Sequence, residues 1–183
     1  MGIVLLIFAI VVSNIGTHGE EVRTSYIPAV AFTQGQTAHL NLTQGEILSY
    51  NKLITNFNSV IGANGVFTAD TEGLYAFHFY SLTKANTKLW LEIMLNGNLV
   101  ASAFAHSSST NGYADAGNSV ILELSRGDTV YVKAHDQYEN ILFGTKDEIY
   151  TTFTGVLINS GYFGFHQIST KGMTAQASTK VLK

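Results

Sequence analysis

Apolar residues alternate with polar or small ones in short runs along most of the chain. Runs with this two-residue period are typical of β-strands, and residues that favour turns separate them. The clearest pair of runs spans 87–106, where Asn96-Gly97 predicts a tight two-residue hairpin turn. A second hairpin is predicted over 118–135, with its turn at Arg126-Gly127-Asp128. No long segment has a helical period with caps, so the pattern predicts an antiparallel all-β sandwich or barrel.

One predicted strand is apolar on both faces, although a half-buried strand should have one polar face. Tyr75, Phe77 and Phe79 fall on one side, while Leu74, Ala76, His78 and Tyr80 fall on the other. Its neighbours place further large groups on their outer faces: Trp90, Met94 and Tyr131. Contiguous exposed apolar surface usually marks an interface, so we expect a second copy of the chain to cover this face. Coverage of both faces within one chain is the alternative.

Composition narrows the class of protein. The 183 residues favour one domain, and 46% hydrophobic against 13% charged residues leaves apolar surface beyond the needs of a core. A formal net charge of −3 argues against nucleic-acid binding, because no basic field is present to neutralise phosphates. The chain contains no cysteine, which excludes disulfides, thiolate metal sites and a cysteine nucleophile.

The two ends of the chain differ from the middle. Residues from Ile3 to Val12 are apolar and are followed by small and polar residues, as in a secretory signal peptide. A buried strand or an uncleaved anchor is the alternative. We predict a signal peptide over 1–19, a linker over 20–27, a globular domain over 28–159 and a flexible tail over 160–183. Secretion would make the Asn41-Leu42-Thr43 sequon a glycosylation site.

Several motifs together resemble the C1q globular-head family. In that family a Phe is followed after six residues by Gly-x-Tyr-x-Phe-x-Phe/Tyr; the matching residues are Phe67, Gly73, Tyr75, Phe77 and Phe79. The segments YNKLITN, VILELSRGDTVYV and TTFTGVLI also resemble family segments, in the same order, between about residues 27 and 158. Tyr50 stands where the family usually has Phe, and Val156 replaces the Phe after the last motif glycine.

The resemblance implies a ten-stranded jelly-roll sandwich that assembles as a compact homotrimer, related in shape to tumour-necrosis-factor cytokines. A collagen-like stalk is not expected, because no Gly-x-y run is present and the chain has a single proline. The second face of the two-faced strand would then be buried by a neighbouring subunit. The residues predicted for the trimer interface are Tyr75, Phe77, Tyr80, Trp90, Met94 and Tyr131.

The sequence contains no recognised enzyme motif: G-x-S-x-G, H-E-x-x-H and a phosphate-cradling glycine loop are all missing. Polar and aromatic residues gather instead in three loops, where recognition usually takes place. Tyrosines there would stack on a sugar ring and amides or carboxylates would bind its hydroxyls; the alternative is ordinary solvated turns. The candidate ligand-binding residues are Asn111, Tyr113, Asp115, Asp136, Tyr138 and Glu139.

No cofactor is required by these motifs, but the family resemblance implies that calcium can be held near the trimer axis or top. The oxygen donors in suitable loops are Asp136, Asp147 and Glu148, without the dense spacing of an EF-hand. The leading hypothesis is therefore a secreted, non-enzymatic, lectin-like protein that recognises microbial glycans in innate immunity. The alternatives are a receptor ligand or synaptic organiser of the cerebellin type, and a structural protein of the extracellular matrix. Its partners would be copies of itself and a carbohydrate or cell-surface ligand.

Overall fold

The computed structural model describes residues 29–108 and 110–160. Within these residues the chain forms β-strands and no helix. The strands are β1 (Ala31–Gln36), β2 (Leu40–Leu42), β3 (Lys52–Phe57), β4 (Val60–Ile61), β5 (Phe67–Thr68), β6 (Gly73–Thr83), β7 (Lys88–Leu95), β8 (Asn98–His106), β9 (Ala114–Leu124), β10 (Thr129–Ala134), β11 (Asn140–Leu142) and β12 (Thr151–Ser160).

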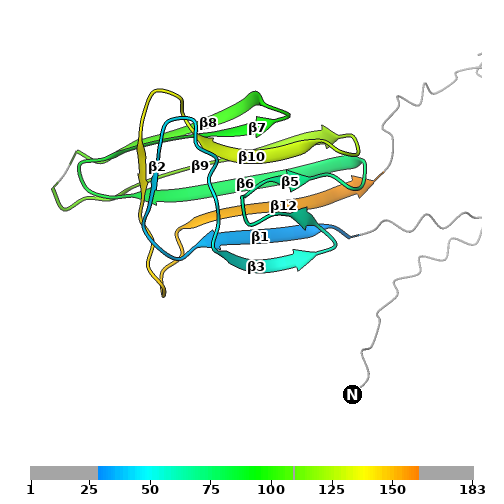
Figure 1. Ribbon diagram of the computed structural model, residues 1–183, viewed down its shortest axis with the longest axis horizontal. Coiled ribbons are helices and arrows are strands. Elements are labelled where there is room, and N and C mark those ends of the chain that lie inside the picture. Colours follow the sequence, from blue (N-terminus) through cyan, green and yellow to red (C-terminus); the bar gives the residue numbers. More distant parts are fainter. Residues whose placement is uncertain (1–28, 109, 161–183) are drawn as a thin grey trace, which may run out of the picture.

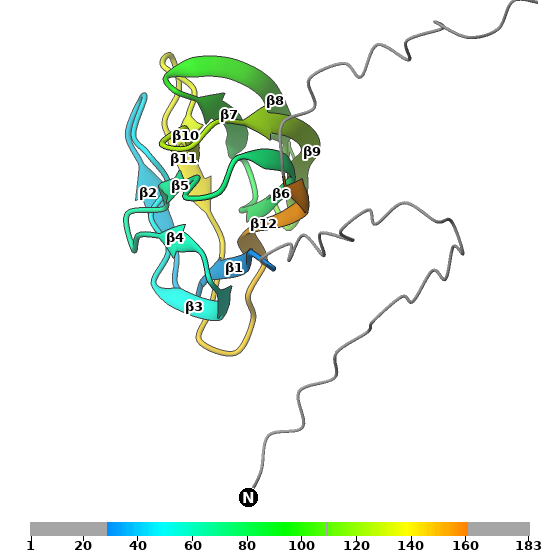
Figure 2. The ribbon, with the colours of Figure 1, turned by 90° about the vertical axis from the view of Figure 1, so that its right-hand side faces the viewer.

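The strands form two antiparallel sheets that pack face to face (Figures 1 and 2). The seven-stranded sheet has the order β2-β11-β6-β12-β1-β3, and β9 pairs with β6; the five-stranded sheet has the order β4-β5-β10-β7-β8. This arrangement confirms the predicted all-β jelly-roll sandwich. The strands outnumber the ten that were expected because β2 and β11 have three residues each and β4 and β5 have two.

The first predicted hairpin is confirmed. β7 pairs with β8 in antiparallel register, and the turn between them is Asn96-Gly97 with φ angles of 51° and 81°. Positive φ at both central residues matches the right-handed twist of the two strands, which is why Asn and Gly are favoured there. The side-chain oxygen of Asn96 also accepts a hydrogen bond from the backbone N–H of Thr129 at 2.8 Å, which ties the turn to β10.

The second predicted hairpin is wrong. β9 pairs along its whole length with β6 in one sheet, whereas β10 pairs with β5 and β7 in the other. The turn at Arg126-Gly127-Asp128 therefore carries the chain from one sheet to the other. Gly127 has a φ of 93°, and its N–H donates to the carbonyl of Ala69 at 2.7 Å. A turn between two apolar runs looks the same in sequence whether the runs pair with each other or face each other across a core.

Aromatic rings fill the space between the sheets. Phe77 is fully buried, and its ring lies 5.5 Å from that of Phe67 and 6.0 Å from that of Phe153. Gly155 leaves room for this cluster, because a Cβ there would lie 2.4 Å from a ring carbon of Phe32. Burial of each such side chain stabilises the fold by about 1.5–3 kcal/mol.

The predicted segments at the two ends lie outside the described residues. This applies to the signal peptide, the linker and the tail apart from its first residue, because β12 continues to Ser160. Within the part of the chain that the structure describes, no helix of membrane-spanning length and hydrophobicity occurs.

Candidate ligand-binding site and the two outer faces

The seven-stranded sheet has an apolar outer face. Along β6 the side chains of Tyr75, Phe77 and Phe79 point into the core, so Tyr80 on the opposite side is 52% exposed. On the same face, four residues along β6 from Tyr80, the strand register places an apolar row across five strands: Ile121, Ala76, Val156, Ala31 and Phe57. No described element covers this row, and Ile121 is 64% exposed. Coverage of both faces of β6 by the described part of the chain is therefore excluded.

A polar row crosses the same face beside the apolar one. The Nδ1 atom of His78 lies 2.8 Å from the hydroxyl of Ser119 on β9. The hydroxyls of Thr33 on β1 and Thr154 on β12 lie 3.0 Å apart, and the register places Thr154 directly opposite His78. These groups therefore find partners within the chain, while the apolar side chains around them do not.

The predicted set of trimer-interface residues needs correction. Tyr75 and Phe77 are 1% and 0% exposed in the single chain, so their side chains have no surface left for a neighbour. Trp90, Met94 and Tyr131 lie on β7 and β10, on the outer side of the five-stranded sheet, and not on the face that carries Tyr80. The physical reason is that these strands face β6 across the core, so their outer sides point in the opposite direction.

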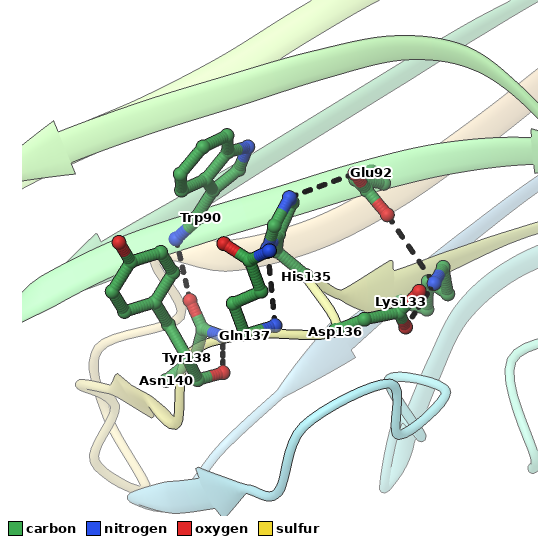
Figure 3. A network of polar contacts seen from close by, with 8 residues as sticks. All are labelled: Trp90, Glu92, Lys133, His135, Asp136, Gln137, Tyr138 and Asn140. Atoms are coloured by element: carbon green, nitrogen blue, oxygen red, sulfur yellow. Dashed lines mark hydrogen bonds and ion pairs between the residues drawn. The ribbon is translucent and has the colours of Figure 1, made fainter.

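The outer face of the five-stranded sheet carries a charged network (Figure 3). Glu92 is only 7% exposed, and its two oxygens lie 3.3 Å from Nζ of Lys133 and 3.7 Å from Nε2 of His135. Lys133 also binds the carboxylate of Asp136. The hydrogen bond that Lys133 donates to Asp136 raises the pKa of Lys133 above its usual value, and the same bond lowers the pKa of Asp136. The buried carboxylate of Glu92 is thus compensated within the chain.

Aromatic rings extend this network toward the loop after β10. The ring of Trp90 stacks on His135 with the centroids 3.8 Å apart, and on Tyr138 with the centroids 5.4 Å apart (Figure 3). The ammonium of Lys88 lies 5.2 Å from the Tyr138 centroid, within the range of a cation–π contact. The side-chain oxygen of Asn140 accepts a hydrogen bond from the backbone N–H of Trp90. These contacts hold the loop against the sheet.

A pocket of about 420 Å³ lies among the loops at one end of the sandwich. Its lining is formed by His39, Lys84, Ala85, Thr110, Asn111, Gly112, Tyr113 and Phe143. Phe143 is the central ring: Tyr113 meets it edge to face at 5.0 Å, and His39 lies 4.8 Å from it. Tyr113 is 58% exposed, so the pocket combines an open aromatic surface with polar groups.

Four parts of the chain that are distant in sequence position this pocket. Lys84 follows the last residue of β6, and Tyr113 precedes the first residue of β9. These two strands pair with each other. Phe143 follows β11, and its N–H donates to the carbonyl of Leu82 at 2.7 Å. Next to it, the N–H of Gly144 donates to Nδ1 of His39 at 3.3 Å. The pocket therefore depends on paired strands and not on one self-contained loop.

The structure separates the six predicted ligand-binding residues. Asn111 and Tyr113 line the pocket, whereas Asp136 and Tyr138 belong to the network on the five-stranded sheet. Asp115 lies opposite Leu82 on the open face of the other sheet, and Glu139 is exposed beside Tyr138.

Sequence reasoning missed His39, Lys84 and Phe143. No local pattern marks them, since His39 and Phe143 are about a hundred positions apart in the chain. Only the pairing of β2 with β11 and of β11 with β6 brings them together.

The three predicted calcium donors do not form a cluster. Among the described residues no three His, Asp or Glu side chains lie together in a way that could hold a metal ion. Asp136 is paired with Lys133. Asp147 and Glu148 are exposed in the turn before β12, where the charge of Glu148 raises the pKa of Tyr150.

Comparison with known protein families gives one clear match. The family described as the C1q domain matches residues 31–158. Zebrafish Caprin-2 is 29% identical over 70% of the chain and 14% of that protein. One of the subunits of the rat complement C1q subcomponent is 32% identical over 64% of the chain and 46% of that protein. Human complement C1q and tumor necrosis factor-related protein 9B is 30% identical over 75% of the chain and 41% of that protein. The chain thus spans less than half the length of each relative.

Solved structures give the same fold. The globular domain of zebrafish complement 1qA protein aligns with a TM-score of 0.59 at 18% identity, over 72% of the chain and 99% of that domain. The Eiger TNF of S. frugiperda aligns with a TM-score of 0.62 at 10% identity, over 74% of the chain and 96% of that structure. At these identities the likeness supports the jelly-roll architecture alone.

Proposed function

Because the chain belongs to the C1q domain family, we propose that it is a secreted, non-enzymatic binding module that recognises carbohydrates on microbial surfaces. The observation that carries this proposal is the pocket around Phe143, which opens among loops on a rigid sandwich. The family match supports the module, and the name of one relative, a complement C1q subcomponent, supports a place in innate immunity outside the cell.

The pocket offers the two kinds of contact that a sugar needs. The exposed ring of Tyr113 presents flat apolar area to the C–H face of a pyranose, and the ring of Phe143 packs against it edge to face. Thr110 and Asn111 place a hydroxyl and an amide at the same rim, where they can bind sugar hydroxyls. A single shallow pocket of this kind buries little ligand, so each site should bind weakly.

A homotrimer would compensate for this weakness. The apolar row that includes Ile121, Val156 and Phe57 is the surface that we propose to be covered in the trimer, together with Tyr80. Obligate interfaces bury about 2,000–5,000 Å² and resemble a protein core, which fits a face of this composition. Three pockets on one particle would act together on a repetitive polysaccharide and raise avidity by about a hundredfold or more.

The test compares two tyrosines in different loops. Tyr113→Ala removes the exposed ring of the pocket, whereas Tyr138→Ala removes a ring that stacks on Trp90 outside it. We expect Tyr113→Ala to weaken binding to immobilised microbial polysaccharide about tenfold or more, since stacking on one ring contributes about 1–1.5 kcal/mol per site and three sites act together. Tyr138→Ala should bind like the unchanged protein. Equal effects of the two substitutions would refute the pocket as the binding site.

Multivalency has its own measurement. The free monosaccharide should compete about a hundredfold less well, per sugar unit, than the polymer. Equal inhibition by monomer and polymer would contradict cooperation among three sites. Both assays use the full secreted protein, and light scattering of each variant checks that its assembly is unchanged.

Glycosylation of Asn41 belongs to the same proposal of secretion. Asn41 lies in β2 opposite Ile141, and β2 is the edge strand of its sheet. Its side chain is exposed, and Thr43 of the sequon is bonded to Glu46 at 2.8 Å. Peptide-N-glycosidase treatment of protein secreted from animal cells should lower its mass; an unchanged mass would remove this part of the proposal.

A further inference from the structure

The pocket around Phe143 carries a positive charge in its lining and no negative charge among the described residues. Its lining contains an ammonium, an imidazole, two hydroxyls and an amide, contributed by Lys84, His39, Thr110, Tyr113 and Asn111. Among the described residues no Asp or Glu lines it. The hydroxyl and amide oxygens can accept the hydroxyl protons of a sugar, but a carboxylate, the strongest acceptor that proteins have, is missing from this lining.

Lys84 is the charged group of this lining, and its surroundings differ from those of Lys133. Lys133 is neutralised by Glu92 and Asp136, whereas Lys84 has no ion-pair partner among the residues that the structure describes. It is partly buried at the end of β6, beside Phe143 and Tyr113. A partly desolvated ammonium without a counter-charge attracts an anion more strongly than a solvated one does.

His39 adds a second donor at the same place. Its Nδ1 accepts the hydrogen bond from the N–H of Gly144, so in the neutral ring the proton is on Nε2. The ring packs against Phe143 with an interplanar angle of 45°. The imidazole therefore contributes an N–H group to the pocket lining and no free acceptor.

We infer that the pocket selects sugars that carry a carboxylate, with Lys84 pairing with that carboxylate while the Tyr113 ring packs against the sugar. The inference rests on the proposed function, because it names the ligand class of the same pocket. Two acidic side chains lie near this region, Asp115 opposite Leu82 on β6 and Glu148 beside Tyr150, but neither lines the pocket. The selected ligand class is thus the hexuronic acids and other carboxylated sugars of surface polysaccharides.

The experiment uses matched pairs of sugars that differ at one carbon. Glucose, galactose and mannose are compared with their uronic acids, in which the C6 hydroxymethyl group is a carboxylate, each coupled at equal density to the same neutral polymer. For the pair that the protein binds, we expect the uronic acid to bind about tenfold or more tightly than the neutral sugar, as a charge-assisted pair requires. The preference should fall as salt is raised from about 0.05 to 0.5 M.

Two lysines give a matched control. Lys84→Met should reduce the preference to about one, and Lys84→Arg should restore most of it, because the positive charge returns. Lys88→Met makes the same charge change on the next strand, outside the pocket lining, and should keep the preference. Equal loss of the preference for uronic acids in both methionine variants would show that the carboxylate responds to the overall charge of the protein and not to Lys84. This result would overturn the inference.

The outcomes separate this inference from the proposed function. If neutral sugars bind as tightly as uronic acids and Tyr113→Ala still abolishes binding, the pocket is a sugar site and only the selection of carboxylates is wrong. A preference that persists in Lys84→Met likewise overturns the role of Lys84. If no sugar of any pair binds to the unchanged protein, both the proposed function and this inference fail.

Discussion

The two outer faces of the sandwich solve the problem of burial in different ways. On the five-stranded sheet, large and charged groups are covered by each other: Trp90 stacks on His135, and Glu92 is paired with Lys133. On the seven-stranded sheet, polar groups are paired in the row of His78 and Ser119, but Ile121 and the side chains beside it are open. The first face pairs its charged groups and stacks Trp90 within the chain, although Leu99 and Phe104 on β8 are each 56% exposed, whereas the second leaves an apolar row without a cover.

This difference shows why apolar outward residues in a sequence do not all have the same meaning. Trp90 and Tyr80 look alike in the sequence, because each is an outward aromatic residue on a long strand. The loop after β10 reaches back over Trp90, but no described segment reaches over Tyr80. Whether an outward aromatic residue is covered therefore depends on the path of a connecting loop.

The largest expected effect comes from a charge placed on the outer face of the seven-stranded sheet. Tyr80→Asp should prevent assembly, with subunit affinity lowered by at least about a hundredfold, because a carboxylate would be buried in the trimer without a partner. Val60→Asp is the control, since Val60 is also 52% exposed but lies on β4 of the other sheet. Light scattering should give a trimer for the unchanged protein and for Val60→Asp, and a monomer or aggregate for Tyr80→Asp. A stable monomer of the unchanged protein would refute the proposal that another subunit covers the face that carries Tyr80.

The next effect tests the charged network on the outer face of the five-stranded sheet. Glu92→Ala removes the buried carboxylate between Lys133 and His135 and should lower the free energy of unfolding by about 2–4 kcal/mol. Lys133 keeps Asp136 as a partner, so the loss should stay below that of a fully orphaned buried charge. Denaturant unfolding measures this loss of stability. In buffer without denaturant the variant should still assemble like the unchanged protein. No loss of stability would mean that the network is not needed to close this face.

The interior provides a smaller effect of opposite sign. The hydroxyl of Tyr50 is buried without a hydrogen-bond partner among the described residues, and burial raises the pKa of this phenol well above its usual value. Tyr50→Phe removes the hydroxyl and keeps the ring that stacks on Phe153. We expect unfolding to become about 0–2 kcal/mol less favourable, because an unsatisfied polar group is lost from the core. Clear destabilisation in urea would show that the hydroxyl is satisfied.

The smallest effect comes from Asp136 at the exposed edge of the network. Its pKa is lowered in the folded state by the hydrogen bond from Lys133, so its contribution to stability is present above its usual pKa of 3.8 and is lost as the pH falls through the lowered value. The pKa of Lys133 is raised, so this pair also weakens when the pH rises through that raised value, above 10.5. Asp136→Asn should therefore lower Tm slightly near neutral pH. Once the pH has fallen through the lowered pKa of Asp136 the difference should disappear, and a difference that does not change with pH would exclude the ion pair as its cause.

Much of the fold could be read from local chemistry in the sequence. Alternating runs predict strands because successive side chains point to opposite faces, and Asn96-Gly97 predicts its turn because both residues tolerate positive φ. The motif around Tyr75, Phe77 and Phe79 predicts the core and the family. These properties depend on neighbours in the chain, so they need no knowledge of the distant segments.

Other features depended on which segments meet in space. The turn at Gly127 joins two sheets and not two paired strands, and Trp90 and Tyr80 lie on opposite sides of the molecule. The pocket brings His39, Lys84 and Phe143 together from three strand ends, while Tyr138, which resembles Tyr113 in sequence, packs elsewhere. Strand pairing fixes these positions through backbone hydrogen bonds, which nearly every residue can make. The sequence by itself therefore determined the strands, the core and the family, and only the tertiary structure decided which surface residues face a common space.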